Sequence, residues 1–194
     1  MQEGNLKERY FKTIRNGLKN SSREGNIYEV PKLTKIVVNT SFGRLSPDQK
    51  TKEQIVDNLA KITGQKPVFT IARAAIAGFK IRKGQVIGAK VTLRGEKMYH
   101  FFEKLVSVVI PRLRDFRGMS DKSFDGKGNY TVGFQEMNLF PEVEYSRSEK
   151  GIGLEITICT SAKGPKDTKK LLTEFGMAFA NREEKETVSA QETK

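Results

Sequence analysis

Hydrophobic residues recur every three or four positions in several stretches of the chain, which is the spacing that lines one face of a helix. In residues 5–20 this stripe consists of Leu6, Tyr10, Ile14 and Leu18, and it is widened by Phe11. A second helix is predicted from a capping motif at Ser46, Pro47 and Gln49 to a stop at Gly64. Its buried face is carried by Ile55, Leu59 and Ile62.

Two more helices are predicted further along the chain. One runs from about Glu96 to Ile110, and Pro111 is expected to end or kink it. Its apolar stripe consists of Met98, Phe101, Phe102, Leu105 and Val109. The last helix spans residues 165–175, with Gly176 well placed as its C-terminal cap.

Other stretches alternate between apolar and polar residues, which is the period of a strand with one buried face. Residues 35–39 place Ile36 and Val38 on one side, and residues 86–94 do the same with Val91 and Leu93. The opposite side of these two strands carries polar side chains, namely Lys35, Asn39, Lys90, Thr92 and Arg94. Residues 68–71, 130–134 and 154–160 are predicted as further strands.

Helices interspersed with a few alternating strands predict an α+β fold of two layers, with helices on one face of a mostly antiparallel sheet. The other sheet face is then free, and the polar side chains of the alternating strands lie on it. The chain of 194 residues has no internal repeat, so we expect one domain over residues 1–180. Residues 181–194 have almost no apolar content and are expected to form a disordered tail.

The positive charge of the chain is concentrated in its middle third. Residues 61–120 hold 13 basic and 3 acidic side chains, whereas residues 121–194 hold 11 basic and 13 acidic ones. A concentrated excess of cations indicates a polyanionic partner, because neutralising phosphates releases condensed counterions. This pattern favours a nucleic acid over an anionic membrane or a merely solvated basic face.

No set of residues in the chain is typical of a catalytic or metal site. His100 is the only histidine, and Cys159 is the only cysteine, expected to act as a small packing residue in its strand. Gly126 and Gly128 resemble a phosphate loop only superficially, because no Gly-Lys-Ser/Thr follows them. We therefore predict no enzyme activity, no metal and no cofactor.

No apolar stretch approaches the roughly 20 residues that span a bilayer. The first 18 residues lack the apolar core of a secretion signal. A cytoplasmic location without membrane contact is therefore expected.

Two basic segments are candidates for contact with a sugar-phosphate backbone. Residues 72–83 mix cations with Phe79 and the flexible Gly78, and their cations are Arg73, Lys80, Arg82 and Lys83. The second segment contains Arg112, Arg114 and Arg117 around Phe116. An ordinary solvated loop is the alternative for each segment.

From about Tyr10 to Phe179 the sequence resembles the bacterial-type L-five family of large-subunit ribosomal proteins. The resemblance rests on many ordered motifs, namely Val30-Pro31, Thr63-Gly64-Gln65-Lys66-Pro67, Ala72-Arg73, Ile76-Ala77-Gly78-Phe79-Lys80-Ile81-Arg82, Lys90-Val91-Thr92-Leu93-Arg94-Gly95-Glu96, Pro111-Arg112, Asp115-Phe116-Arg117-Gly118, Ser123-Phe124-Asp125-Gly126, Gly128-Asn129-Tyr130 and Phe140-Pro141-Glu142. Any one motif alone would be weak, but their number and order make the assignment specific.

The resemblance implies a structural protein that binds 5S ribosomal RNA and helps to attach it in the central protuberance. It also implies contact with large-subunit ribosomal RNA and neighbouring large-subunit proteins, with the P-site transfer RNA, and with a small-subunit head protein of the S-thirteen family, and no homo-oligomer is expected. The residues matching the family's polar contacts to 5S RNA are Asn39, Gln65 and Thr92. On the same free face, Lys35, Lys90 and Arg94 are expected to bind ribosomal RNA.

The resemblance assigns the two basic segments to other partners. Residues 72–83 match the loop that approaches transfer RNA, with Arg73, Gly78, Phe79, Lys80, Arg82 and Lys83 as its contacts. The inter-subunit bridge is matched by Arg112, Arg114, Arg117, Pro141 and Glu142. Ala74 and Ala75 depart from the family, which commonly has Lys and Ser there. A free-standing RNA chaperone or transfer-RNA-binding module and a basic-surfaced enzyme are the alternatives.

Overall fold

The computed structural model describes residues 6–20, 26–41, 49–114, 116–143 and 152–180. Their centre is one five-stranded sheet in the order β2-β3-β1-β5-β4, in which every neighbouring pair is antiparallel. The strands are β1 (Leu33–Ser41), β2 (Val68–Ile71), β3 (Val86–Leu93), β4 (Tyr130–Phe134) and β5 (Leu154–Thr160). All five predicted strands are present, and the predicted α+β class is confirmed.

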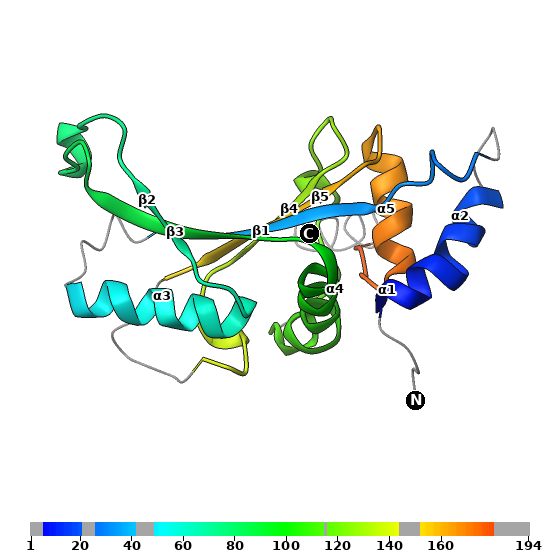
Figure 1. The fold of residues 1–194 in the computed structure, drawn as a ribbon, viewed down its shortest axis with the longest axis horizontal. Helices are drawn as coiled ribbons and strands as arrows, with labels where there is room; N and C mark the ends of the chain where they lie inside the picture. The colour runs from blue at the N-terminus through cyan, green and yellow to red at the C-terminus, as the bar shows by residue number, and fades with distance from the viewer. Residues whose placement is uncertain (1–5, 21–25, 42–48, 115, 144–151, 181–194) are drawn as a thin grey trace, which may run out of the picture.

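The helices form the second layer (Figure 1). Helix α3 (Gln49–Thr63) and helix α4 (Gly95–Lys104) lie on one side of the sheet, whereas the N-terminal helix and α5 (Pro165–Glu174) pack beside its far end. The N-terminal helix is α1 (Leu6–Arg9), a π-helical segment (Tyr10–Ile14) and α2 (Arg15–Asn20). The stacked rings of Tyr10 and Phe175, 5.6 Å apart, join it to the chain that follows α5.

The predicted apolar stripes explain why these segments are helical and which face each helix buries. The stripes of the N-terminal helix, α3 and α4 are buried in one hydrophobic core with Ile36, Val38 and Ile158 of the sheet. Phe11 does not belong to its stripe: it is 51% exposed, because the residue after Tyr10 is turned away from the buried face around the helix. The prediction for Phe11 was therefore wrong.

The helix ends follow the predicted breakers where the structure describes them. Gly64 (φ 64°) follows α3, and the predicted capping residues Ser46 and Pro47 lie outside the described residues. After α4 the chain continues as a π-helical segment (Leu105–Val109) and a 3-10 turn (Ile110–Arg112), so that Pro111 ends the helical region. Gly176 (φ 97°) terminates α5, with its N–H and that of Met177 donating to carbonyls of the last turn.

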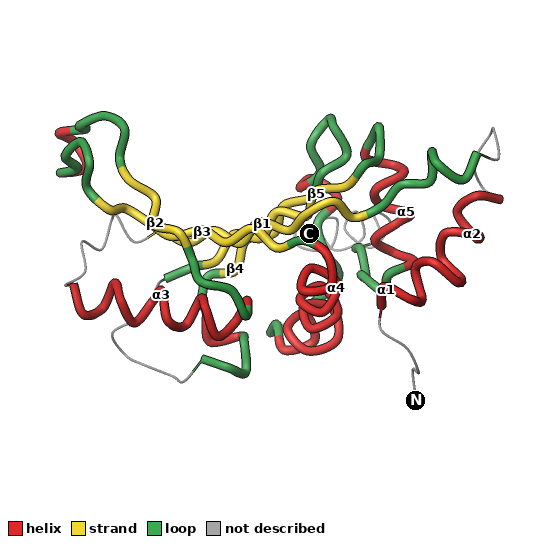
Figure 2. Tube along the Cα trace, viewed as in Figure 1, coloured by secondary structure: helices red, strands yellow, loops and turns green. Residues whose placement is uncertain are grey.

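The loop between β2 and β3 projects from one end of the sheet, on the side away from α3 (Figure 2). The segment that precedes β4 and the turn that follows β5 rise on the same side at the other end (Figure 1). No helix covers the sheet between them in the described part of the chain. In the described part of the chain, the free face is therefore not covered by a helix, and loops rise on its side at both ends of the sheet.

Candidate nucleic-acid interface

The strand register aligns side chains of the free face in rows that cross the sheet. One row runs Lys90, Asn39, Glu155, Gly133, because Asn39 pairs with Lys90 on one side and with Glu155 on the other, and Glu155 pairs with Gly133. Val68 of β2 extends this row beyond Lys90 and is 63% exposed. A cation, an amide and a carboxylate therefore stand on three adjacent strands.

The next row is made of small hydroxyl and aliphatic side chains. It runs Thr92, Val37, Thr157, Thr131, and the hydroxyl oxygens of Thr131 and Thr157 lie 3.2 Å apart. Lys35 comes one row further and pairs with Cys159. Cys159 is thus on the free face and half-buried, on the opposite side of β5 from the core residues Ile156 and Ile158.

Two of the amide side chains are held in place by hydrogen bonds. The Asn39 Nδ2 donates to Glu155 Oε2 at 3.3 Å. The Gln65 Nε2 donates to the carbonyl oxygen of Thr92 at 3.4 Å, although Gln65 follows α3 and is not in the sheet. The turn that carries Gln65 follows Thr63, whose single hydroxyl hydrogen is shared between the carbonyl oxygens of Leu59 at 2.7 Å and Gln65 at 3.1 Å.

The structure brings together most of the residues predicted for ribosomal RNA contact. Lys35, Asn39, Lys90 and Thr92 share the free face, and Gln65 reaches it from the side. Arg94 is the exception: it lies beyond the end of β3, has no pair in the register and leads into α4. The alternation ended one residue earlier than predicted because the helix begins at Gly95.

Sequence reasoning missed the contribution of β4 and β5 to this face. Glu155, Thr157 and Thr131 lie on it, and Glu155 is its only acidic side chain among the described strands. Ile156 and Ile158 are fully buried, so the residues between and before them, 155 and 157, lie on the opposite face of the strand. The sequence alone does not show that β5 is a neighbour of β1.

The β2–β3 loop is compact and its cations are exposed. Ala72 and Gln85 close its base, with the Ala72 N–H donating to the Gln85 carbonyl at 2.9 Å, and Ile76 and Ile81 form a bridge near its tip. The predicted transfer-RNA contacts are all exposed: Arg73, Gly78, Phe79, Lys80, Arg82 and Lys83. Lys80 has a left-handed backbone (φ 54°), and Phe79 is 61% exposed. The tip therefore presents cations beside an exposed ring.

The residues predicted for the inter-subunit bridge lie in two separate settings. Arg112 and Arg114 line a groove of about 750 Å³ beside β4. Arg117, three residues after Arg114, is exposed. Pro141 is exposed, whereas Glu142 points inward and forms an ion pair with Lys104 at 2.6 Å. Residues 144–151, which follow Pro141 and Glu142, lie outside the described residues.

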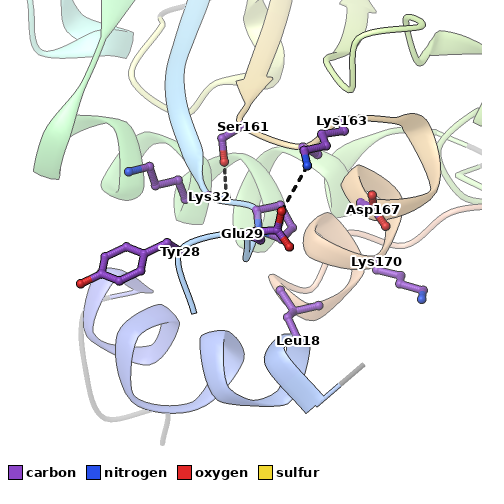
Figure 3. A pocket seen from close by; sticks show the side chains of 10 residues that line it. Leu18, Tyr28, Glu29, Lys32, Ser161, Lys163, Asp167 and Lys170 are labelled. Atoms are coloured by element: carbon purple, nitrogen blue, oxygen red, sulfur yellow. Dashed lines mark hydrogen bonds and ion pairs between the residues drawn. The ribbon is translucent and has the colours of Figure 1, made fainter. Parts of the chain in front are cut away.

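A further pocket of about 520 Å³ lies where the segment after α2 meets the turn between β5 and α5 (Figure 3). Its wall is held by an ion pair between Lys163 and Glu29 at 3.2 Å and by the backbone N–H of Lys32, which donates to the Ser161 hydroxyl at 3.0 Å. Its lining residues include neither histidine nor cysteine. We find no arrangement for acid–base or nucleophilic chemistry in it.

The remaining candidate chemistry is sparse. His100 is exposed and lies in a shallow groove with Lys61 and Lys97. Within the described ranges, no three histidine, cysteine or acidic side chains gather as metal ligands. Nor does any described helix combine the length and apolarity that crossing a membrane requires.

Comparison with family models gives two matches that together span most of the described chain. Residues 26–82 match the model described as Ribosomal protein L5, and residues 86–179 match the model of the ribosomal L5 family C-terminus. The two segments meet within the β2–β3 loop, so β1 and β2 fall in the first match and β3, β4 and β5 in the second.

Proposed function

Because the chain belongs to the ribosomal protein L5 family, we propose that its free sheet face is the binding site for 5S ribosomal RNA. Membership makes the chain a structural constituent of the large ribosomal subunit that binds ribosomal RNA, located in the cytoplasm as part of the ribosome. The enzyme and free-standing-module alternatives are thereby excluded. The finer assignments below are our proposals.

The strand register is the observation that carries the 5S assignment. Asn39 and Thr92 lie on adjacent strands as diagonal neighbours, and Gln65 is hydrogen-bonded to the backbone of Thr92. Three uncharged side chains with donors and acceptors are thus gathered on a face whose cations, Lys35 and Lys90, flank them. Cations fix the position of an RNA backbone, whereas amides and hydroxyls discriminate its bases and 2′-hydroxyls.

Replacing Asn39, Gln65 and Thr92 together with Ala tests the site. Each lost hydrogen bond should cost about 0.5–1.5 kcal/mol, so the triple variant should bind 5S RNA roughly 10- to 1000-fold more weakly in a filter-binding or fluorescence assay. The matched control replaces the same residue types on exposed helix surfaces, at Asn16, Gln54 and Thr173. Unchanged affinity in a folded triple variant would remove the sheet face from 5S recognition.

We propose that the β2–β3 loop contacts the P-site transfer RNA and not 5S RNA. The loop projects beyond the end of the sheet (Figure 1), and its cations Arg73, Lys80 and Arg82 are exposed and suited to phosphates. Several weak phosphate contacts suit a partner that must leave at every translocation step, because they hold without reading sequence. The exposed ring of Phe79 adds a surface on which a base can stack.

Neutralising Arg73, Lys80 and Arg82 with Gln tests the loop. We expect 5S binding and subunit assembly to be retained, and P-site transfer RNA to dissociate faster from ribosomes that carry the variant. The control neutralises three exposed helix cations, Arg9, Lys61 and Lys166. If the loop variant loses 5S RNA first, the loop belongs to the 5S site.

The inter-subunit bridge is the remaining part of the proposal. Arg112 and Arg114 beside the 750 Å³ groove, with Arg117, form the cationic surface that we assign to the small-subunit head protein of the S-thirteen family. Pro141 contributes an exposed apolar contact. Glu142 supports this surface indirectly, since its carboxylate is engaged by Lys104.

A further inference from the structure

Among the described strands, a single carboxylate lies in the interior of the free face, where an RNA site would be expected to exclude negative charge. Glu155 is exposed on β5, which has β1 on one side and β4 on the other, so it is not at an edge of the sheet. A phosphate placed over it would be repelled. Either the RNA backbone avoids this point, or the carboxylate faces a part of the RNA that donates hydrogen bonds.

The neighbours of Glu155 favour the second arrangement. On one side Asn39 donates one of its two amide hydrogens to Glu155 Oε2, at 3.3 Å, which fixes the orientation of the carboxylate. On the other side stands Gly133, where an added Cβ would meet no atom within 4 Å. The carboxylate thus borders a position of the sheet that carries no side chain and has open space where a Cβ would be.

We propose that Glu155 recognises the Watson–Crick edge of an unpaired guanine in the bound RNA, with the base lying over Gly133. Guanine presents two adjacent donors on that edge, N1–H and the N2 amino group, and a carboxylate offers two acceptor oxygens with capacity beyond the Asn39 bond. Lys90 stands two strands away, roughly 9–10 Å at the usual strand spacing, and is placed to receive phosphate. The row of side chains from Lys90 to Gly133 would then bind a base at the Glu155 end and the RNA backbone at the Lys90 end.

This inference rests on the proposed 5S site and deepens it, because it names a residue that discriminates between bases. The substitution Glu155→Gln distinguishes base recognition from two simpler roles of Glu155, which are positioning Asn39 and repelling phosphate. A Gln side chain keeps one oxygen to accept the Asn39 bond, so a residue that only positions Asn39 would tolerate it. The new amide would, however, turn an N–H group toward the guanine donors.

The test compares Glu155→Gln and Glu155→Ala with the wild-type protein in binding to 5S RNA. We expect both variants to bind roughly 5- to 100-fold more weakly, with an unchanged salt dependence. A control, Glu174→Gln, removes the same charge from an exposed position on α5 and should not weaken binding. Binding by the Gln variant equal to wild type would reduce Glu155 to a positioning residue, and tighter binding by both variants would reduce it to a repelling charge; either result overturns the inference.

The base itself is identified by repeating the assay with 5S RNA in which inosine, which lacks the N2 amino group, randomly replaces guanosine. A position where inosine impairs binding of the wild-type protein, but not of the Glu155→Gln variant, is the expected result. Absence of such a position overturns the guanine assignment. Failure of the 5S site as a whole is distinguishable, since the Asn39, Gln65 and Thr92 triple variant would then bind normally.

Discussion

Lys104 joins three parts of the helix layer, and its replacement by Met should expose how that layer is held together. Its ammonium group donates to the carbonyl oxygen of Ile62 at the end of α3 (2.7 Å) and to Glu142 Oε1 (2.6 Å). It also lies 5.8 and 5.9 Å from the ring centroids of Phe101 and Phe140. The Met side chain keeps the apolar stem but removes every one of these polar contacts.

The expected cost can be built from these contacts. A hydrogen bond from a charged group contributes about 1.5–3 kcal/mol, and each cation–π contact about 0.5–1 kcal/mol. The ion pair adds less than a buried one would, because its side chains are 22% and 32% exposed and solvent screens them. The contributions are not additive, so we expect a loss of about 2–4 kcal/mol and a fall in Tm of roughly 5–12 °C.

Removing Lys104 leaves the Glu142 carboxylate without its cation, while Glu142 Oε2 is buried and has no hydrogen-bond partner among the described residues. A second change, Glu142→Gln, should therefore recover about 1 kcal/mol in the Lys104→Met background, although it destabilises the wild-type protein. Thermal and urea unfolding of the four proteins in this double-mutant cycle measure the coupling. Lys12→Met, which breaks the exposed ion pair with Glu8, is the control and should cost about 0.3–0.5 kcal/mol. A Lys104→Met loss no larger than the control, or no recovery by Glu142→Gln, would refute this account.

Three further predictions concern the segment that precedes β4 and the end of the chain. Gly128→Ala should destabilise the protein by about 2–4 kcal/mol in urea unfolding, because Gly128 has φ 79° and an added Cβ would lie 2.7 Å from the Ala162 carbonyl oxygen. The control is Gly126→Ala, where the added Cβ meets open space, and it should change stability by less than about 0.5 kcal/mol. Hydrogen bonds from Asn129 lower the pKa of Asp125 below its usual 3.8, so the stabilisation from Asp125 is present above about pH 4 and is lost as the pH falls through the native pKa. Asp125→Ala should therefore flatten the pH dependence of Tm below pH 4. The same fall of Tm with pH in the variant and in the wild-type protein would contradict this. Truncation after Ala180 should leave Tm and 5S binding nearly unchanged, since residues 181–194 have only Val188 and Ala190 as apolar content; a large drop in either would show that the tail docks.

Local pattern was enough to predict the individual elements of this fold. The ranges predicted for β2, β4 and β5 agree with the structure, because each is a short alternating or β-branched run bounded by turn residues. The buried stripe of the N-terminal helix was also predicted, apart from Phe11. These properties depend on residues close in sequence.

Neighbour relations were beyond the reach of the same reasoning. Alternation tells which way a side chain points but not which strand lies beside it, so Glu155 could not be paired with Asn39 before the strand order was known. The Lys104–Glu142 ion pair joins residues 38 positions apart and follows from no local pattern. The candidate site was therefore predictable on β1 and β3, whose polar residues alternate clearly, and not on β4 and β5.

The strand order also constrains when the proposed RNA site can exist. β1 lies between β3 and β5, while β2, its companion in the first matched segment, reaches it only through β3. A chain folded only over residues 26–82 would have Asn39 on a strand without either neighbour, and Gln65 without the Thr92 carbonyl that holds it. The face therefore forms only when both matched segments fold into one sheet. An RNA that binds this face binds the folded chain but not the unfolded chain. By mass action it should therefore raise the free energy of unfolding of both segments together.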